Sequence, residues 1–291
     1  MILVDFSQVF IGNVFHATRG GEELSEGLVR HMVLNNIRHY RNDFGKEYGQ
    51  VVLCCDGRHV WRKDVFPYYK ASRKRHKIES PLDWGTLYDC LNTIRDEIRD
   101  TFPYPVIHLD RIEADDIIAV LCRNHFKKHR ESDNIPEVII ISSDKDFVQL
   151  QQFDFVNQFS PLTKKNVTHD DPKYYLHEHI LRGDTGDGVP NILSQDDVFM
   201  EDGLRQKPLS KKKIREWYDS KLKPIDYCNR EMHRNYLRNV QLIDLITGIP
   251  SWVSESIMKE YQGQLHKDRG KIFNYFVKNK LSKLMEVIDE F

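Results

Sequence analysis

Residues 137–146 read EVIIISSDKD, an unbroken apolar run that leads into a pair of aspartates. Val138 and the isoleucines after it are β-branched, and a continuous run of this kind predicts a strand buried on both faces, as in a parallel sheet. The same layout recurs in residues 2–5 (ILVD) and 50–56 (QVVLCCD), and residues 105–109 are read as a further strand. Helical patterns separate these runs, so the sequence predicts an α/β domain with a parallel sheet.

The helical patterns divide the chain into two regions. In the first half, apolar residues recur at helical spacing in residues 24–41 and 113–129. After about residue 182 the strand signals end, and a loop-rich junction is marked by Gly183, Gly186, Gly188 and Pro190. Helical patterns then follow in residues 210–222, 229–246, 252–261 and 271–289. We predict an α/β region over residues 1–182 and a smaller, mainly helical region over residues 183–291.

The composition is typical of a globular protein that is in contact with water. The chain has 291 residues, of which 43 are Lys or Arg and 44 are Asp or Glu, and its mean hydropathy is −0.58. No stretch approaches the ~20 uninterrupted apolar residues of a membrane span, and the N-terminus does not read as a signal peptide. The five cysteines lack CxxC spacing, which argues against a disulfide framework and a cysteine zinc site. We expect a monomeric cytoplasmic protein that binds no membrane.

Positive charge is concentrated in two segments although the net charge is only −1. Residues 58–78 contain eight basic residues and one acidic residue, and residues 204–223 contain eight basic residues and two acidic ones. Within the first segment, residues 66–75 interleave aromatic and basic side chains, a combination typical of single-strand binding. The residues that we expect on nucleic acid are Arg62, Lys63, Tyr69, Lys70, Arg73, Lys74, Arg75, Lys211, Lys212 and Lys213.

Carboxylates follow three of the predicted strands. Asp5, Asp56 and Asp144 lie at strand ends, where a parallel sheet binds its ligands. Residues 113–116 (EADD) open a helix, and residues 183–188 (GDTGDG) place two more acids on a glycine-rich loop. Each acid taken alone could be a helix cap or turn residue. If these carboxylates converge, each pair about 4 Å apart repels by ~4 kcal/mol at an effective dielectric constant of about 20. The pattern therefore predicts bound cations, and oxygen ligands favour Mg²⁺ or Mn²⁺. More than four acids suggest two ions.

The spacing leaves one pairing open. Glu113 and Asp116 share a face of a regular helix, whereas Glu113 and Asp115 can converge if Glu113 still lies in the extended approach to the helix. The histidines are scattered, and His177 and His179, like His31 and His39, are read as residues of helix surfaces or edges rather than metal ligands.

Two other functions compete with metal-dependent cleavage of nucleic acid. A metal-dependent phosphatase of another α/β family is disfavoured because the first strand ends in Asp5-Phe6-Ser7 and lacks a DxD nucleophile motif. A nucleic-acid-binding module without catalysis is disfavoured because it would gain nothing from negative charge beside phosphates.

The acidic motifs, taken in order, resemble those of the 5′ nuclease (flap endonuclease) family over nearly the whole chain. The segments that most resemble the family's bacteriophage ribonuclease H branch are residues 2–8 (ILVDFSQ), 52–56 (VLCCD), 140–144 (IISSD) and 270–278 (GKIFNYFVK). The resemblance implies a parallel-sheet, PIN-like nuclease domain with a helical arch over roughly residues 60–95, which admits a single-stranded 5′ end. It also implies that the helical region at 183–291 binds duplex.

The resemblance further implies the roles of individual residues. Lys70 and Arg73 would contact the scissile phosphate and, with Asp115 and Asp144, would be the catalytic residues. The implied metal ligands are Asp5, Asp56, Glu113, Asp115 and Asp144 for one ion, with Asp116 in support, and Asp146, Asp184 and Asp187 nearer a second ion. Residues 189–197 lack the family's glycine-rich duplex-gripping hairpin, and residues 210–213 (SKKK) are the substitute that we expect.

The implied activity is that of a Mg²⁺-dependent 5′-to-3′ exonuclease and flap endonuclease, with Mn²⁺ able to replace Mg²⁺. Such an enzyme removes RNA primers and adjoining DNA during phage replication. Its substrates would be RNA/DNA and DNA duplexes with 5′ ends, flaps or forks. Its expected protein partners are the phage single-stranded DNA-binding protein and the sliding clamp.

Overall fold

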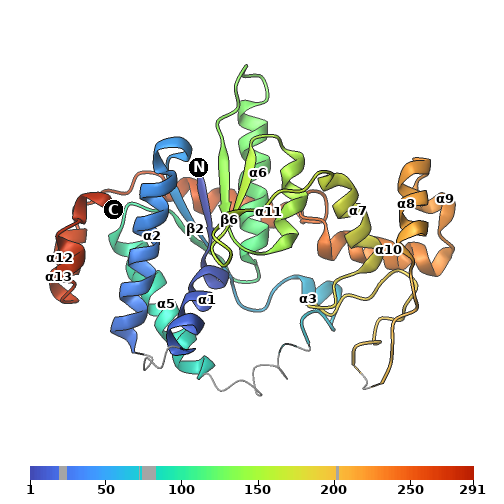
Figure 1. Cartoon of the computed structure of the whole chain (residues 1–291), viewed down its shortest axis with the longest axis horizontal. Helices are drawn as coiled ribbons and strands as arrows, with labels where there is room; N and C mark the ends of the chain where they lie inside the picture. The colour runs from blue at the N-terminus through green and yellow to red at the C-terminus, as the bar shows by residue number, and fades with distance from the viewer. Residues whose placement is uncertain (20–24, 72, 74–82, 201–202) are drawn as a thin grey trace.

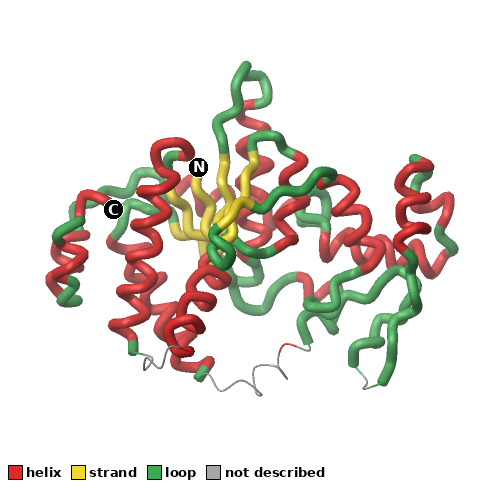
Figure 2. The backbone as a smooth tube through the Cα atoms, in the orientation of Figure 1, coloured by secondary structure: helices red, strands yellow, loops and turns green. Residues whose placement is uncertain are grey.

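A sheet lies at the centre of the protein (Figure 2). It has six strands in the described part of the chain. The computed structural model describes residues 1–19, 25–71, 73, 83–200 and 203–291. The strands are β1 (Ile2–Asp5), β2 (Val51–Cys55), β3 (Val106–His108), β4 (Val138–Ile141), β5 (Val156–Ser160) and β6 (Lys165–Asn166). They lie in the order β3-β2-β1-β4-β5-β6, and every neighbouring pair is parallel except β5 and β6. The predicted parallel sheet is therefore confirmed.

Helices connect the strands and make up most of the second half of the chain. Those of the first half are α1 (Phe6–Arg19), α2 (Glu26–Tyr48), α3 (Arg62–Val65), α5 (Trp84–Thr101), α6 (Ala114–His129), the 3₁₀ helix η1 (Lys145–Gln152) and α7 (Pro172–Arg182). Those of the second half are α8 (Lys211–Ser220), α9 (Pro224–Tyr227), α10 (Arg230–Ile243), α11 (Ser251–Gly263), α12 (Ile272–Lys278), α13 (Ser282–Met285) and the 3₁₀ helix η2 (Ile288–Glu290).

Each face of the sheet carries its own hydrophobic core. On one face, helices α1, α2 and α5 bury side chains such as Ile37 and Ile94 together with Phe276 of α12. On the other face, α6 and α11 bury Ile117 and Val253 against the strands. Because both faces are covered, the central strands are almost entirely apolar and the polar ends of the strands are left at the edge of the sheet.

The second half of the chain extends in two directions. Helices α8 and α9 lie at one end of the molecule, whereas α12 and α13 lie at the opposite end beside α2 (Figure 1). A small cluster that includes Leu181, Ile192 and Ile214 joins α7 to α8. The last forty or so residues therefore complete the cores of the sheet, and the segment from α7 to α10 forms the outlying part.

Several elements differ from the sequence-based expectation. Residues 271–289, predicted as one helix, form the three short helices α12, α13 and η2. Strand β5 was not predicted, because polar Asn157 and Gln158 interrupt its apolar pattern; Gln158 is buried and donates to the carbonyl oxygens of Ser142 and Asp144. The predicted arch over residues 60–95 falls partly on residues 72 and 74–82, which lie outside the described residues. Within the described part of the chain, no helix is long and apolar enough to cross a membrane.

Candidate active site

Three adjacent strands deliver carboxylates to one edge of the sheet. Strand β1 ends at Asp5, Asp56 follows β2, and Asp144 follows β4 after two serines. Because β2, β1 and β4 are neighbours, these side chains lie next to one another beyond the carboxyl ends of the strands. The first turn of α6 adds Asp115. All four line a cleft of about 580 Å³, which we call the acidic cleft.

Burial and mutual repulsion raise the pKa values of two of these acids. The Asp5 carboxylate is 5% exposed and accepts hydrogen bonds from the Ser142 hydroxyl (3.0 Å) and the Gln8 amide (3.3 Å). Burial, and then the charge of Asp56, raise the pKa of Asp5 to about 8. Burial and the neighbouring Asp144 likewise raise the pKa of Asp115 well above its ordinary value. The protein supplies too little positive charge here to neutralise its own acids.

The other side of the acidic cleft is formed by acids on η1 and on the glycine-rich loop. Asp144 caps η1 by accepting the Asp146 amide at 2.9 Å, which places Asp146 in the first turn of η1. Asp184 accepts the Asp187 amide at 3.0 Å, so the loop after α7 closes into a tight turn. Burial raises the pKa of Asp146 to about 7, although the nearby His179 opposes the shift. Asp146, Asp184 and Asp187 line the acidic cleft with the four acids named above.

The tight turn requires glycine at two positions. Gly183 has φ of +69°, and a Cβ built on it would lie 2.2 Å from the Val189 carbonyl oxygen. Gly188 has φ of +71°, and its Cβ would lie 3.1 Å from the carbonyl oxygen of Tyr68. The loop that bears the two aspartates therefore packs directly against the loop that bears Lys70.

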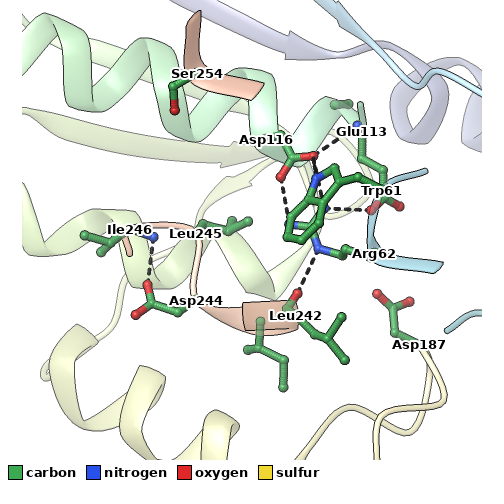
Figure 3. Close-up of polar contacts among 12 residues, drawn as sticks. Trp61, Arg62, Glu113, Asp116, Asp187, Leu242, Asp244, Leu245, Ile246 and Ser254 are labelled. Atoms are coloured by element: carbon green, nitrogen blue, oxygen red, sulfur yellow. Dashed lines mark hydrogen bonds and ion pairs between the residues drawn. The ribbon is translucent and has the colours of Figure 1, made fainter. Parts of the chain in front are cut away.

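A second group of acids lies beside the acidic cleft, fully inside the protein (Figure 3). Arg62 donates to Glu113 (Nη1 to Oε2, 2.8 Å) and to Asp116 (Nη2 to Oδ1, 2.7 Å), and its Nε donates to the Leu242 carbonyl. The Trp61 indole donates to Asp116 at 2.9 Å. We call Trp61, Arg62, Glu113 and Asp116 the Arg62 cluster.

The Arg62 cluster decides the pairing that the spacing left open. Glu113 is extended (φ −92°, ψ 158°) and caps α6, while Asp116 accepts the Glu113 amide and is fully buried. Glu113 and Asp116 thus face Arg62, and Asp115 is the acid of this helix start that lines the acidic cleft. Although burial favours the neutral carboxyl, Lys70 and Arg62 lower the pKa of Glu113 to about 2.

Lys70 and Arg73 lie at the rim of the acidic cleft. The Lys70 ammonium contacts Glu113 at 2.5 Å and Asp187 at 3.6 Å, and the Arg73 guanidinium contacts Asp187 at 2.5 Å. Lys70 adopts a left-handed φ of +57°, and its amide donates to the Asp187 carbonyl at 2.7 Å. This backbone contact fixes the basic loop over the glycine-rich loop.

The residues expected on nucleic acid have different environments. Arg62 and Tyr69 are each 2% exposed; the Tyr69 hydroxyl donates to Asp187 at 2.9 Å, so both side chains face acids inside the protein and not a ligand. Lys63 and Lys211–Lys213 are exposed, the latter in the first turn of α8. Lys74 and Arg75 lie outside the described residues.

His179 is the site residue that sequence reasoning missed. It lies near the end of α7 with its ring between Asp146 and Asp184. The one available signal in the sequence was that His179 lies five residues before Asp184, on a predicted helix that leads into the glycine-rich loop. This spacing alone does not specify the direction of the imidazole ring. Tyr69 was placed on nucleic acid because aromatic and basic residues alternate around it, a pattern that does not report burial.

Comparison with known families assigns both halves of the chain. Residues 1–177 match the model of the 5′-3′ exonuclease N-terminal resolvase-like domain, and residues 172–291 match that of the T4 RNase H C-terminal domain. Ribonuclease H of Enterobacteria phage T4 is 30% identical over 99% of this chain and 95% of its own length. Flap endonuclease Xni of Shewanella sp. strain MR-4 is 31% identical over 49% of this chain and 52% of its own length.

Solved structures share the fold. A zinc-bound T5 5′-exonuclease has a TM-score of 0.61 at 16% identity, and a T5 flap endonuclease complexed with DNA and metal ions has a TM-score of 0.62 at 17% identity. Each alignment covers 91% of this chain and 99% of the other. The family resemblance and the PIN-like α/β fold predicted from the motifs are confirmed. The chain belongs to the 5′-3′ exonuclease family of nucleases, with a C-terminal part of the T4 RNase H type.

Proposed function

We propose that this nuclease is a Mg²⁺-dependent 5′-to-3′ exonuclease and flap endonuclease that uses two metal ions. The observation that carries the proposal is the acidic cleft, in which carboxylates from three strand ends and α6 converge, and in which burial and neighbouring acids raise the pKa values of Asp5 and Asp115. Burial, and then the charges of Asp56 and Asp144, raise the pKa of Asp5 to about 8. Such a concentration of negative charge binds phosphate only after cations have neutralised it.

The donor atoms fit hard divalent ions. Asp5, Asp56, Asp115 and Asp144 offer only carboxylate oxygen, which Mg²⁺ and Mn²⁺ prefer, and we assign them to a first ion. Asp146, Asp184 and Asp187 would hold a second ion. When bound, the ions would supply the positive charge that stabilises the attacking and leaving oxygens of a phosphodiester. Glu113 and Asp116, which we expected among the ligands or beside them, are assigned instead to orient Arg62 and Lys70.

Lys70 and Arg73 are proposed to hold the scissile phosphate. Both reach the rim of the acidic cleft from a loop whose backbone is fixed to Asp187, so their charges are placed before the substrate arrives. A phosphate oxygen can replace Glu113 and Asp187 as the acceptor of these donors as charge develops on the phosphate. Asp115 and Asp144 complete the proposed catalytic set.

Duplex binding is proposed for the basic start of α8. Lys211, Lys212 and Lys213 occupy the first turn, where positive side chains oppose the helix dipole. Phosphates would offset this unfavourable placement, and α8 lies at the outer end of the molecule, where a duplex can approach it (Figure 1). The expected contacts of Lys63, Lys74 and Arg75 with the single strand remain part of the proposal.

The proposed biological role is removal of RNA primers and adjoining DNA during phage replication in the host cytoplasm. The substrates would be RNA/DNA and DNA duplexes with 5′ ends, flaps or forks, bound by a monomer. The phage single-stranded DNA-binding protein and sliding clamp are the proposed partners.

The test is incubation of a 5′-labelled flap duplex with Mg²⁺, with and without EDTA. We expect short labelled products with Mg²⁺ and none with EDTA. Matched substrates with an RNA or a DNA 5′ segment measure the preference between them. Release of inorganic phosphate without backbone cleavage would indicate a phosphatase, and retention of an intact substrate would indicate a binding module; either result would overturn the proposal.

A further inference from the structure

The ring of His179 is held between two acids of the acidic cleft. Its Nε2 lies 3.3 Å from Asp184 Oδ2, and its Nδ1 lies 3.5 Å from Asp146 Oδ1. The side chain is 14% exposed, and the rim of Tyr175 packs against it with ring centroids 5.8 Å apart. One ligand atom from each of His179, Asp146 and Asp184 lies within 4.8 Å of the others. The three residues therefore form a compact set with one nitrogen and two oxygen donors.

The two ring nitrogens of His179 differ in what they contact. Nε2 is within hydrogen-bonding distance of Asp184, whereas the longer contact from Nδ1 to Asp146 is an ion-pair approach. If the neutral ring carries its proton on Nε2, that N–H donates to Asp184. Nδ1 then has a free lone pair, which points toward Asp146. Histidines that bind metals typically donate their other ring N–H to a carboxylate in this way.

The Nδ1 to Asp146 distance also suits two ligands of one ion. Ligand atoms ~2.1 Å from an octahedral ion lie about 3.0 Å apart when adjacent and about 4.2 Å apart when opposite. The observed 3.5 Å falls between these values, so small side-chain rotations suffice to place an ion between the two atoms.

We propose that His179 Nδ1 is a nitrogen ligand of the second ion beside Asp146, and that Asp184 orients the ring by accepting its Nε2 proton. This inference rests on the proposed metal-dependent function and distinguishes its two ion sites. The set of Asp5, Asp56, Asp115 and Asp144 offers oxygen alone and suits Mg²⁺, whereas imidazole nitrogen adds affinity for transition ions such as Mn²⁺ far more than for Mg²⁺. The second site therefore binds Mn²⁺ more tightly than Mg²⁺, and it sets the response of the enzyme to the two ions.

The experiment measures metal binding and not cleavage. The full chain is loaded with one and with two equivalents of Mn²⁺, and pulsed electron paramagnetic resonance detects ¹⁴N coupled to Mn²⁺; calorimetry gives the Mn²⁺ and Mg²⁺ affinities. We expect a coordinated imidazole ¹⁴N in the wild type that His179→Gln removes. The variant should bind Mn²⁺ at one site at least about tenfold more weakly, with less than about a threefold change for Mg²⁺.

His177→Gln is the matched control. His177 lies on the same helix, two residues earlier; its ring faces Tyr218 of α8 with centroids 5.3 Å apart, and it is not among the residues that line the acidic cleft. The control should keep both the ¹⁴N signal and the Mn²⁺ affinity. Circular dichroism checks that each variant is folded, and absence of a coupled ¹⁴N in the wild type would overturn the proposal without any variant.

The possible outcomes distinguish the ligand role of His179 from the proposed nuclease function. Mn²⁺ that binds without coupled ¹⁴N at either loading, or a signal that persists in His179→Gln, would overturn the ligand role of His179 and leave the proposed nuclease function standing; the ring would then only pair with the two acids. A wild-type protein that binds neither Mn²⁺ nor Mg²⁺ would overturn the proposed function and this inference with it.

Discussion

The acidic cleft and the Arg62 cluster both contain carboxyl groups, but the pKa values of Asp5 and Glu113, one from each, shift in opposite directions. In the Arg62 cluster, buried carboxylates are paired with a buried guanidinium, and the charges of Lys70 and Arg62 lower the pKa of Glu113 to about 2. In the acidic cleft, carboxylates face one another, and the pKa of Asp5 rises to about 8. Asp115 and Asp116 are adjacent in sequence and belong to different regions. The comparison teaches that the acids paired with Arg62 serve the structure, whereas Asp5, Asp56, Asp115 and Asp144, which lie together at the strand ends, are available to ligands.

The largest expected effect is the loss of cleavage in Asp115→Asn. Removing this proposed ligand of the first ion should lower the single-turnover rate by at least ~10³-fold, roughly 4 kcal/mol in activation free energy. Flap binding should be unchanged or tighter, since one negative charge near phosphate is gone. Rapid-quench kinetics and a binding titration measure the two quantities. A parallel loss of binding and cleavage would argue against a catalytic role.

Asp116→Asn should instead affect stability. The change leaves Arg62 buried without its closest partner, and breaking a buried ion pair costs about 3 kcal/mol or more in the free energy of unfolding. Urea unfolding measures the difference, with Asp115→Asn as the matched control; that variant should be as stable as the wild type or more stable. Equal destabilisation by the two substitutions would contradict the division into two regions.

Lys70→Ala and Arg73→Ala probe the contact between the two regions, because Lys70 touches both Glu113 and Asp187. If these cations hold the scissile phosphate as charge develops, each substitution should lower the single-turnover rate by ~10²-fold and weaken affinity much less. A uniform loss in affinity with a smaller salt dependence would assign both to general backbone binding.

The smallest expected effect concerns α8, far from either group of acids. Replacing Lys211, Lys212 and Lys213 by alanine should flatten the slope of log K against log[salt] for duplex by roughly 0.9 for each phosphate that the protein no longer neutralises. Cleavage at saturating enzyme should change little, and binding of a short single strand should change less than binding of duplex. An unchanged duplex slope would make this run an ordinary exposed helix start.

The sequence predicts the acidic cleft better than it predicts the Arg62 cluster. Strands that are buried on both faces appear in the sequence as continuous apolar runs. Parallel strands end at the same edge of the sheet, so the sequence alone predicts that Asp5, Asp56 and Asp144 lie close together. The Arg62 cluster depends on tertiary contacts between residues about 50 positions apart and on the extended backbone of Glu113. Neither leaves a periodic signal.

Residues with polar or aromatic side chains were the hardest to place. Tyr69 and Arg62 lie in a basic, aromatic segment that is typical of a nucleic-acid surface, yet both are buried against carboxylates. Gln158 is buried in a strand because it satisfies two carbonyl groups, and its polarity hid the strand. In each case a specific partner far away in the sequence outweighs the average preference of the residue type.

The acidic cleft should also make metal-free stability depend on pH. The raised pKa values of Asp5 (about 8) and Asp146 (about 7) mean that the folded protein keeps protons that the unfolded chain releases near pH 4. Their contribution to stability is therefore lost as the pH rises through these values. The lowered pKa of Glu113 acts oppositely, since its contribution is lost only as the pH falls from about 4 toward 2.

The most direct test of the central claim is the gain in melting temperature on adding Mg²⁺ in place of EDTA, measured from about pH 6 to pH 9. Each gain compares the same protein at the same pH with Mg²⁺ and with EDTA. Titrating groups outside the acidic cleft therefore contribute equally to the two melting temperatures, and their contributions cancel in the difference. We predict that the gain in melting temperature grows with pH in the wild type and is smaller in Asp115→Asn. Asp116→Asn should keep the gain, although its melting temperature in EDTA should be lower than that of the wild type. No gain at any pH, or a gain lost in Asp116→Asn and kept in Asp115→Asn, would contradict the account.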